Sequence, residues 1–319
     1  MRLPQRFYRL PVRFDVERLR AEVASLPPSA WSRHPNGDAG NDAVRLISVE
    51  GGDNEEMNGA MRMTPHLERL PYVRQVLASF RVVWSRSRLL RLAPGAEVPV
   101  HADVHHHWFH RVRMHVPILT RPEVQFTCDR ERVHMAAGEA WLFDNWRLHQ
   151  VENPSDSERI HLVGDTSGSA AFWELAAQSD KPGVNVRFHA YDPAQQATPL
   201  TERALPRPVM PPAELDLLIM DMRSELVVEV DDPDHRARLA RYHALLLGFG
   251  RDWRQLYALQ GEEPQGWPEF EKLRDRMCEQ SRLLSSGLMA RTNRVTAQRL
   301  LEARILRPCL FAPAHRPAC

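Results

Sequence analysis

The stretch from His101 to His115, "HADVHHHWFHRVRMH", is rich in side chains that bind metals. It holds six histidines, one aspartate and two arginines in fifteen positions. Alternate side chains of an extended segment point the same way, so His101 and Asp103 can reach a common point. Two imidazoles and one carboxylate suit Fe(II) and leave three coordination positions open. His149, in "FDNWRLHQVEN", is the best candidate for the third ligand.

The residues after His149 suggest a partner for an anion. "HQVENPSDSERIHLV" is typical of two strands joined by a tight turn around Pro154 and Ser155. In a regular hairpin His149 and Arg159 face each other or miss by one pair, with Cβ atoms about 5 Å apart. A guanidinium then lies about the length of a small dicarboxylate from the metal. 2-Oxoglutarate fits this spacing, because its keto acid end can chelate iron while its distal carboxylate meets Arg159.

The adjacent histidines His105, His106 and His107 are less informative. They could form a second metal cluster, but three successive side chains in a loop cannot all point inward. We expect a solvated segment at the mouth of a barrel instead. Cys128 has no nearby base, so nucleophilic catalysis is not expected there.

The elements that would position these residues change type along the chain. From Arg81 to about Asp165, short alternating runs broken by turn residues predict an all-β sandwich or barrel. The polar segment of residues 50–65 is either a plain connector or an active-site lid. The preceding part predicts strands at Tyr8–Val12 and Ala43–Val49, and helices at Asp15–Ser25 and Pro65–Phe80.

The last third of the chain is predicted to be helical. Residues 181–210 are rich in proline and predict an extended linker. The expected division is a β domain at residues 1–180, this linker, and a helical domain at residues 211–319. Helices are expected from Pro211 onward and at Asp234–Leu247, Arg251–Leu259, Pro268–Leu284 and Arg291–Leu306.

Composition excludes several classes of function. The chain of 319 residues has 42 basic and 41 acidic side chains, so neither nucleic acid nor an anionic membrane is an expected partner. The four cysteines form no CxxC pair, and no run of eighteen apolar residues occurs. We expect a soluble, cytoplasmic protein, possible oligomers, and a small-molecule amino acid or peptide as substrate.

Four segments carry a resemblance to a known family. "LAPGAEVPVHAD", "RMHVPI", "GEAWLFDNWRLHQVEN" and "RIHLVGD" resemble the aspartyl/asparaginyl β-hydroxylase family of Fe(II)/2-oxoglutarate oxygenases. His149 follows Asp103 by 46 positions and Arg159 follows ten later, an order that is also similar to the bacterial proline hydroxylases of that family. The resemblance covers about residues 65–170. Animal aspartyl hydroxylases of the family lack the carboxylate that Asp103 supplies here.

The resemblance implies a fold and a set of roles. The fold is α+β, with a double-stranded β-helix core (jelly-roll, cupin-like), flanking helices and a C-terminal helical domain. His101, Asp103 and His149 would bind iron, and Arg159 would bind the C5 carboxylate of 2-oxoglutarate. The segment "RMH" implies that His115 approaches 2-oxoglutarate and that Arg113 approaches a substrate carboxylate.

The predicted function is that of an Fe(II)- and 2-oxoglutarate-dependent dioxygenase. It would use O2 to hydroxylate an unactivated C–H bond of an amino acid, free like proline or within a peptide or natural-product precursor, releasing succinate and CO2. Asp103 fills the position that related halogenases leave for chloride, which favours hydroxylation. Two alternatives remain: a cupin-like iron dioxygenase that does not use 2-oxoglutarate, and a non-catalytic binding or scaffold protein that acts through its helical domain.

Overall fold

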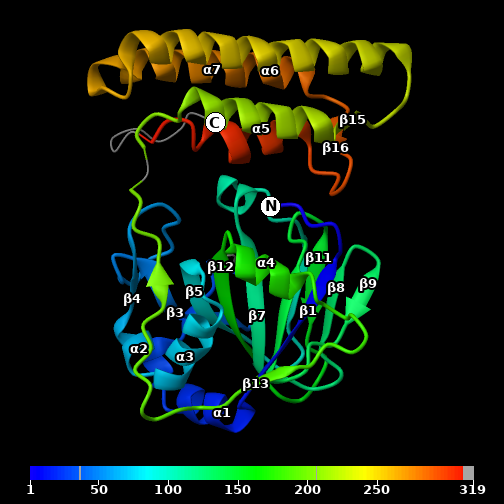
Figure 1. Cartoon of the computed structure of the whole chain (residues 1–319). Coiled ribbons are helices and arrows are strands. Elements are labelled where there is room, and N and C mark those ends of the chain that lie inside the picture. Colours follow the sequence, from blue (N-terminus) through cyan, green and yellow to red (C-terminus); the bar gives the residue numbers. More distant parts are fainter. Residues whose placement is uncertain (36, 206, 312–319) are drawn as a thin grey trace. The chain divides into compact units, whose positions relative to one another are not determined.

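The computed structural model describes residues 1–35, 37–205 and 207–311 (Figure 1). The contacts between Cα atoms divide the chain into two compact units. The β unit comprises residues 1–102 and 110–205, and the helical unit comprises residues 103–109 together with the chain from residue 206 onward. The predicted division at residues 180 and 210 stays a prediction. The segment 103–109, within the predicted metal-binding stretch, thus belongs by its contacts with the helical unit.

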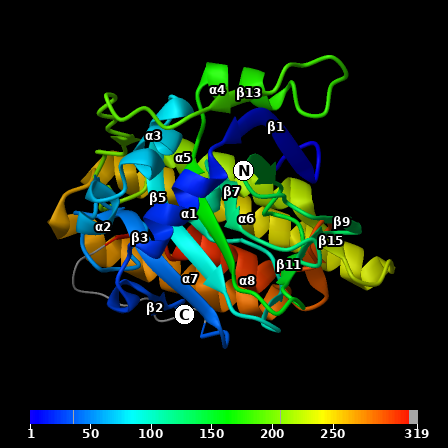
Figure 2. The same ribbon diagram turned by 90° about the horizontal axis from the view of Figure 1, so that it is seen from below.

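The larger sheet of the β unit has ten strands. Eight of them run in the order β13-β1-β10-β7-β12-β5-β3-β2, with β14 beside β5 and β4 beside β3. All the pairs are antiparallel except β13 with β1 and β14 with β5. In Figure 2, β3 and β5 run side by side. The strands are β1 (Phe7–Phe14), β2 (Ser32–Arg33), β3 (Asn41–Val49), β4 (Met61–Met63), β5 (Val83–Leu92), β7 (Val112–Leu119), β10 (Glu139–Phe143), β12 (Arg159–Thr166), β13 (Arg187–His189) and β14 (Leu200–Thr201).

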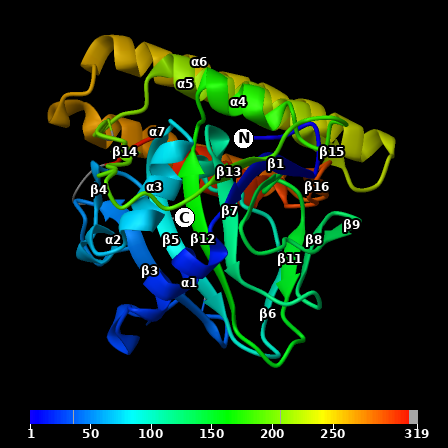
Figure 3. The same cartoon turned by 60° about the horizontal axis from the view of Figure 1, so that its bottom comes forward.

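The smaller sheet has four antiparallel strands in the order β6-β11-β8-β9, which lie beside β7 in Figure 3. One apolar cluster joins both sheets, since it contains Leu92 and Trp141 from the larger sheet and Phe126 and Val151 from the smaller one. The two sheets therefore pack face to face, as in a double-stranded β-helix. The face of the larger sheet that contacts this cluster is called the inner face below. The four strands are β6 (Glu97–His101), β8 (Gln125–Cys128), β9 (Glu131–Val133) and β11 (His149–Glu152).

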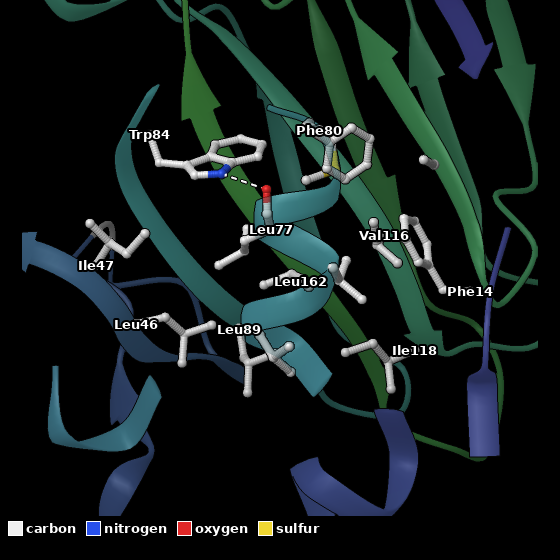
Figure 4. Packing of buried hydrophobic residues seen from close by; sticks show 14 of the residues in the cluster. Phe14, Leu46, Ile47, Leu77, Phe80, Trp84, Leu89, Val116, Ile118 and Leu162 are labelled. Carbon is white, nitrogen blue, oxygen red and sulfur yellow. Dashed lines mark hydrogen bonds between the residues drawn. The ribbon is translucent and has the colours of Figure 1, made fainter. Parts of the chain in front are cut away.

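Helices cover the opposite face of the larger sheet. Figure 4 shows Leu77 and Phe80 packed against Trp84, Leu89 and Leu162 of the sheet. The indole nitrogen of Trp84 donates a hydrogen bond of 2.9 Å to the carbonyl of Leu77. The helices and turns of this unit are α1 (Val16–Ala24), η1 (Pro28–Ala30), α2 (Pro65–Glu68), α3 (Pro71–Ser79) and α4 (Ala170–Ala176).

Two of these helices are joined by a buried carboxylate. Asp15 caps α1 by accepting a hydrogen bond from the backbone N–H of Arg18. Glu22, which is buried in α1, accepts hydrogen bonds from the backbone N–H groups of Tyr72 and Val73 in the first turn of α3. A carboxylate at this end of a helix satisfies donors that have no partner within the helix. The side chain of Glu22 thereby fixes the helical layer behind the sheet.

The helical unit contains the long helices α5, α6 and α7. The apolar stripe predicted for the first of them is buried, through Leu215, Leu218, Ile219 and Met222. None of the helices in the described part of the chain is long and apolar enough to cross a membrane. The elements of this unit are η2 (His106–Phe109), α5 (Pro212–Glu225), β15 (Leu226–Val228), α6 (Pro233–Gln260), η3 (Pro264–Gly266), α7 (Trp267–Leu284), β16 (Leu288–Ala290), α8 (Ala297–Leu301) and η4 (Glu302–Leu306).

The predicted hairpin between His149 and Arg159 is wrong. β11 pairs with β6 and β8 in the smaller sheet, whereas β12 pairs with β5 and β7 in the larger one. The turn between them crosses from one sheet to the other. The side-chain amide of Asn153 donates to the carbonyls of Leu92, Ala93 and Ser157, which holds this corner to the end of β5.

Several predicted helices and loops have different bounds. The helix predicted for Pro65–Phe80 is two helices, because Leu70 before Pro71 leaves the helical conformation. The two helices predicted between residues 234 and 259 form one continuous α6. The predicted helix at Arg291–Leu306 begins only at Ala297. The loop of residues 50–65 contains β4, and residues 181–210 contain β13 and β14.

Candidate active site

His101, Asp103 and His149 lie close together. Each offers one ligand atom, and these three atoms all lie within 4.8 Å of one another. His149 is directly paired with His101 across β11 and β6, and the ring centroids are 4.2 Å apart. Asp103 follows His101 by two residues. The donor set is therefore two imidazoles and one carboxylate, which suits Fe(II).

Backbone carbonyls fix the protonation of both imidazoles. His101 Nδ1 lies 2.7 Å from the carbonyl of Pro99, and His149 Nδ1 lies 2.9 Å from the carbonyl of Arg147. A carbonyl can only accept, so each Nδ1 carries the proton and each Nε2 carries the lone pair. This second hydrogen bond of a ligating histidine orients the ring and raises its basicity. Both rings thus have the tautomer that metal binding through Nε2 requires.

Arg159 is a buried cation without an anionic partner. Its side chain lies at the start of β12, where only 3% of the residue is exposed. Burial lowers the pKa of its guanidinium to about 9, and no carboxylate of the described residues offsets that shift. Its Nη2 donates to His161 Nδ1 at 2.8 Å, while its Nε makes no hydrogen bond among the described residues. An uncompensated buried charge is costly, so this arrangement calls for an anion.

Two neutral histidines lie next to Arg159. Because a guanidinium can only donate, His161 accepts on Nδ1 and carries its proton on Nε2. Burial and the neighbouring Arg159 hold the pKa of His115 and of His161 well below the usual value for histidine. In both rings Nε2 is buried without a hydrogen bond to the described residues. Together with Arg159, they present polar atoms that a bound polar ligand can satisfy.

Arg113 lies on the inner face but is engaged by a carboxylate. Asp165 is directly paired with it across β12 and β7. Arg113 donates from Nε and Nη2 to the two oxygens of Asp165, at 2.8 and 3.2 Å. Asp165 is 1% exposed. The predicted contact of Arg113 with a substrate carboxylate stays a prediction, in a setting where Asp165 already orients the guanidinium.

Sequence reasoning missed a further group of charged residues on the inner face. Arg86 and Arg88 of β5 are each 5% exposed, and both form ion pairs with Glu55 of the loop between β3 and β4. Asp165 also lies 3.6 Å from Arg86. Alternation along β5 could have indicated the arginines, since Arg86 and Arg88 share parity. The position of Glu55 had no periodic signal.

The histidine run after Asp103 is not the solvated segment that was expected. His107 and Trp108 are buried, and their rings are in edge contact with centroids 4.8 Å apart. His106 Nε2 lies 2.9 Å from Glu214 Oε1 of α5. The contacts made by these side chains within the helical unit explain why the expectation of a solvated loop was wrong.

Cys128 behaves as a structural thiol. It is fully buried in the apolar cluster between the sheets. Burial raises the pKa of its thiol to about 12, so the reactive thiolate is not populated at neutral pH.

Comparison with known proteins identifies relatives of the β unit. Residues 32–167 match the family model described as "Aspartyl/Asparaginyl beta-hydroxylase". An "L-proline cis-3-hydroxylase 1" from Streptomyces sp. is 24% identical over 183 residues, which are 53% of this chain and 62% of that protein. The chain thus spans less than two thirds of the length of this curated relative.

Solved structures give weaker similarities. HygX from Streptomyces hygroscopicus, solved with nickel and 2-oxoglutarate bound, is 14% identical, with 51% of this chain and 83% of that chain covered at a TM-score of 0.36. A Pseudomonas putida prolyl-4-hydroxylase is 12% identical, with 52% and 95% covered at a TM-score of 0.35. At these scores neither structure carries the assignment of a role to any residue of this chain.

Proposed function

We propose that this chain, whose residues 32–167 belong to the aspartyl/asparaginyl β-hydroxylase family, is an Fe(II)- and 2-oxoglutarate-dependent hydroxylase of an amino acid, either free or within a peptide or natural-product precursor. Fe(II) and 2-oxoglutarate are the cofactor and co-substrate typical of that family. The observation that carries the proposal is Arg159, a buried cation with no carboxylate partner among the described residues, in the same unit as His101 and His149.

The residues fit Fe(II). Two Nε2 lone pairs and one carboxylate supply a facial set of three ligands. Three coordination positions then remain for the co-substrate and O2. In this proposal His101, Asp103 and His149 hold the metal.

The residues also fit a dicarboxylate. The guanidinium of Arg159 would bind the C5 carboxylate of 2-oxoglutarate, and this pairing would compensate its burial. Nε2 of His161 carries a proton and can donate a further hydrogen bond. His115 lies beside it, with the two Nδ1 atoms 3.3 Å apart. A neutral pair of rings allows the pocket to recognise an anion without a second buried charge.

The protein's part in the reaction is orientation. When bound, Fe(II) supplies the oxidation of a C–H bond by O2, coupled to conversion of 2-oxoglutarate into succinate and CO2. Arg159 fixes one end of the co-substrate, and the carbonyls of Pro99 and Arg147 fix the planes of two ligating rings. The apolar cluster of Phe126, Trp141 and its neighbours excludes water from the space between the sheets. Rigid strands carry His101, His149 and Arg159, as precise chemistry requires.

The substrate class comes from the relative that hydroxylates L-proline, and its extension to this chain is part of the proposal. The test is succinate formation by purified protein with Fe(II), 2-oxoglutarate, O2 and a panel of the twenty amino acids, followed by peptides. We expect a product heavier by one oxygen. His149→Ala and Asp103→Ala should reduce succinate formation by about 100-fold or more, since each removes a metal ligand.

The two alternative functions give different results in this assay. Substrate oxidation without 2-oxoglutarate would favour a cupin-like iron dioxygenase. A protein that takes up no Fe(II) and releases no succinate with any substrate would contradict the proposal and favour a binding or scaffold role.

A further inference from the structure

A cluster of charged side chains occupies the inner face of the larger sheet, further along the strands from Arg159. Arg88 is directly paired with Val163, and Val163 is directly paired with His115 on the other side. Directly paired residues project to the same face of a sheet, so Arg88 shares the face of His115. By alternation along β12, Arg159 lies on that face too. The row of Arg88 is four residues from that of Arg159, about 13 Å along the strand.

Three buried guanidiniums meet two carboxylates in this cluster. Asp165 forms a two-point pair with Arg113 and lies 3.6 Å from Arg86. Glu55 forms ion pairs with Arg88 and, at 4.0 Å, with Arg86. Glu55 is therefore the carboxylate that balances the arginines of β5 not already matched by Asp165.

Glu55 differs from Asp165 in how it is held. It lies in the irregular loop between β3 and β4, and its side chain is 26% exposed, against 1% for that of Asp165. Arg45 contacts its other oxygen at 2.7 Å. Neither oxygen of Glu55 meets hydrogen-bond geometry with any described residue. Charge alone thus holds this carboxylate, without the directional bonds that Asp165 makes.

We propose that Arg86 and Arg88 form the docking site for a carboxylate of the substrate, and that Glu55 occupies this site until the substrate displaces it. A guanidinium pairs best with a carboxylate when two parallel hydrogen bonds form. Glu55 does not form them, whereas a mobile ligand can approach in the required plane. The inference rests on the proposed function and adds that the substrate carries a carboxylate.

The arrangement also explains why the site can wait without a ligand. Arg86 and Arg88 would repel each other if no anion lay between them, and burial adds to that cost. A loop carboxylate removes this cost while the substrate is absent. A substrate carboxylate restores the same balance when it replaces Glu55.

The test compares free amino acids with their carboxamides, which lack the negative charge. Each of the twenty L-amino acids and its amide is added to protein loaded with Mn(II) and 2-oxoglutarate, and binding is measured by calorimetry and thermal shift. For Glu55→Gln, which removes the competing carboxylate, we expect at least one free acid to bind about 10- to 100-fold more tightly than its amide. The same acid should bind the wild-type protein less tightly than it binds this variant.

A double variant isolates Arg88 and guards against misfolding. Glu55→Gln/Arg88→Met removes both charges of one pair, so neither charge is left buried alone. It should bind acid and amide with affinities within about threefold of each other, the level left by the remaining cation. Arg91→Met is the matched control, because Arg91 projects from the opposite face of β5, where it pairs with Asp42 and stacks on Trp31. It should keep the wild-type preference for the acid.

Three outcomes overturn the inference. They are a Glu55→Gln variant that prefers no free acid in the panel, a double variant that keeps the full preference, and a wild-type protein that binds the acid as tightly as Glu55→Gln. Failure of the proposed function has a separate signature, since it requires that 2-oxoglutarate does not bind the wild-type protein in the presence of Mn(II).

Discussion

Two regions of the inner face contain buried arginines, and they solve the problem of buried charge differently. Arg159 has only neutral neighbours, of which His161 accepts one hydrogen bond. Arg86, Arg88 and Arg113 lie among carboxylates of the same chain. Both regions belong to the β unit and share strands β5 and β12.

The difference separates a charge kept for an external ligand from a charge neutralised by the fold. A buried ion without a counterion destabilises the ligand-free protein and gains most from an anion. A buried ion within a pair contributes to stability when its partner is present and destabilises the fold when one partner is removed. The same kind of substitution should therefore have opposite effects on stability in the two regions.

The largest effect is expected from Arg159→Met. Loss of the single buried cation facing the co-substrate should weaken 2-oxoglutarate binding by about 100-fold or more. Calorimetry with Mn(II)-loaded protein measures this directly. Arg159→Lys should recover part of the affinity, because it restores charge but not the two-pronged geometry. Unchanged affinity in Arg159→Met would show that the dicarboxylate binds elsewhere.

Stability of the ligand-free protein should distinguish the two regions by sign. Arg88→Met leaves Glu55 with fewer cationic partners and should lower the free energy of unfolding by about 3 kcal/mol. Arg159→Met removes an uncompensated charge and should raise it by about 1 kcal/mol. Urea denaturation of both variants without ligands provides the measurement. Losses of equal size in both variants would remove the distinction drawn here.

Ligand-induced stabilisation should depend on Arg159 alone. With Mn(II) present and 2-oxoglutarate at about 100 times its Kd, the wild-type protein should gain about 2.7 kcal/mol in unfolding free energy. Arg159→Met should gain almost nothing at the same concentration. Arg91→Met, with its substitution on the opposite face of β5, should respond as the wild type does. A full response in Arg159→Met would contradict the proposed role of this residue.

The smallest effect concerns the neutral histidine beside Arg159. Burial, with Arg159 nearby, holds the pKa of His161 well below its value in the unfolded chain, about 6.5. Below that pH the unfolded state binds a proton that the folded state does not, so stability is lost as the pH falls. Between pH 7 and 5.5 this histidine should cost about 1 kcal/mol. His161→Gln should lose that much less than the wild type in urea denaturation at the two pH values, and an equal loss would mean that His161 is charged in the folded protein.

Local patterns in the sequence were sufficient to select the three residues that lie together. His101 and Asp103 share a side because they are two apart in an extended segment, and His149 is paired directly with His101. The jelly-roll core follows from the same alternation, with Trp141 and Phe143 buried between the sheets as expected. Their roles in metal binding remain a prediction that the assays above address.

Strand partners could not be predicted from local patterns. The residues from 149 to 163 have the pattern of a hairpin, yet β11 and β12 each bond to strands distant in sequence. Asn153, which reads as a turn residue, binds three carbonyls at the corner between the sheets. Pairing choices of this kind depend on the whole sheet.

The glycines of α6 show the same limitation. Gly248 and Gly250 suggested a break, but each costs a helix only about 1 kcal/mol. A Cβ atom at Gly250 would lie 3.0 Å from Ile219 Cδ1 of α5. Close packing of two helices thus explains one glycine that looked like a helix end.

The carbonyls that orient His101 and His149 both come from the residue two positions earlier, Pro99 and Arg147. Every amino acid supplies a main-chain oxygen, and that oxygen does not titrate. The ring orientation of these two histidines is therefore insensitive to acidity and to which side chain evolution places at positions 99 and 147, so long as the local backbone path is preserved. The chain can vary next to its proposed metal ligands without losing the means of aiming them.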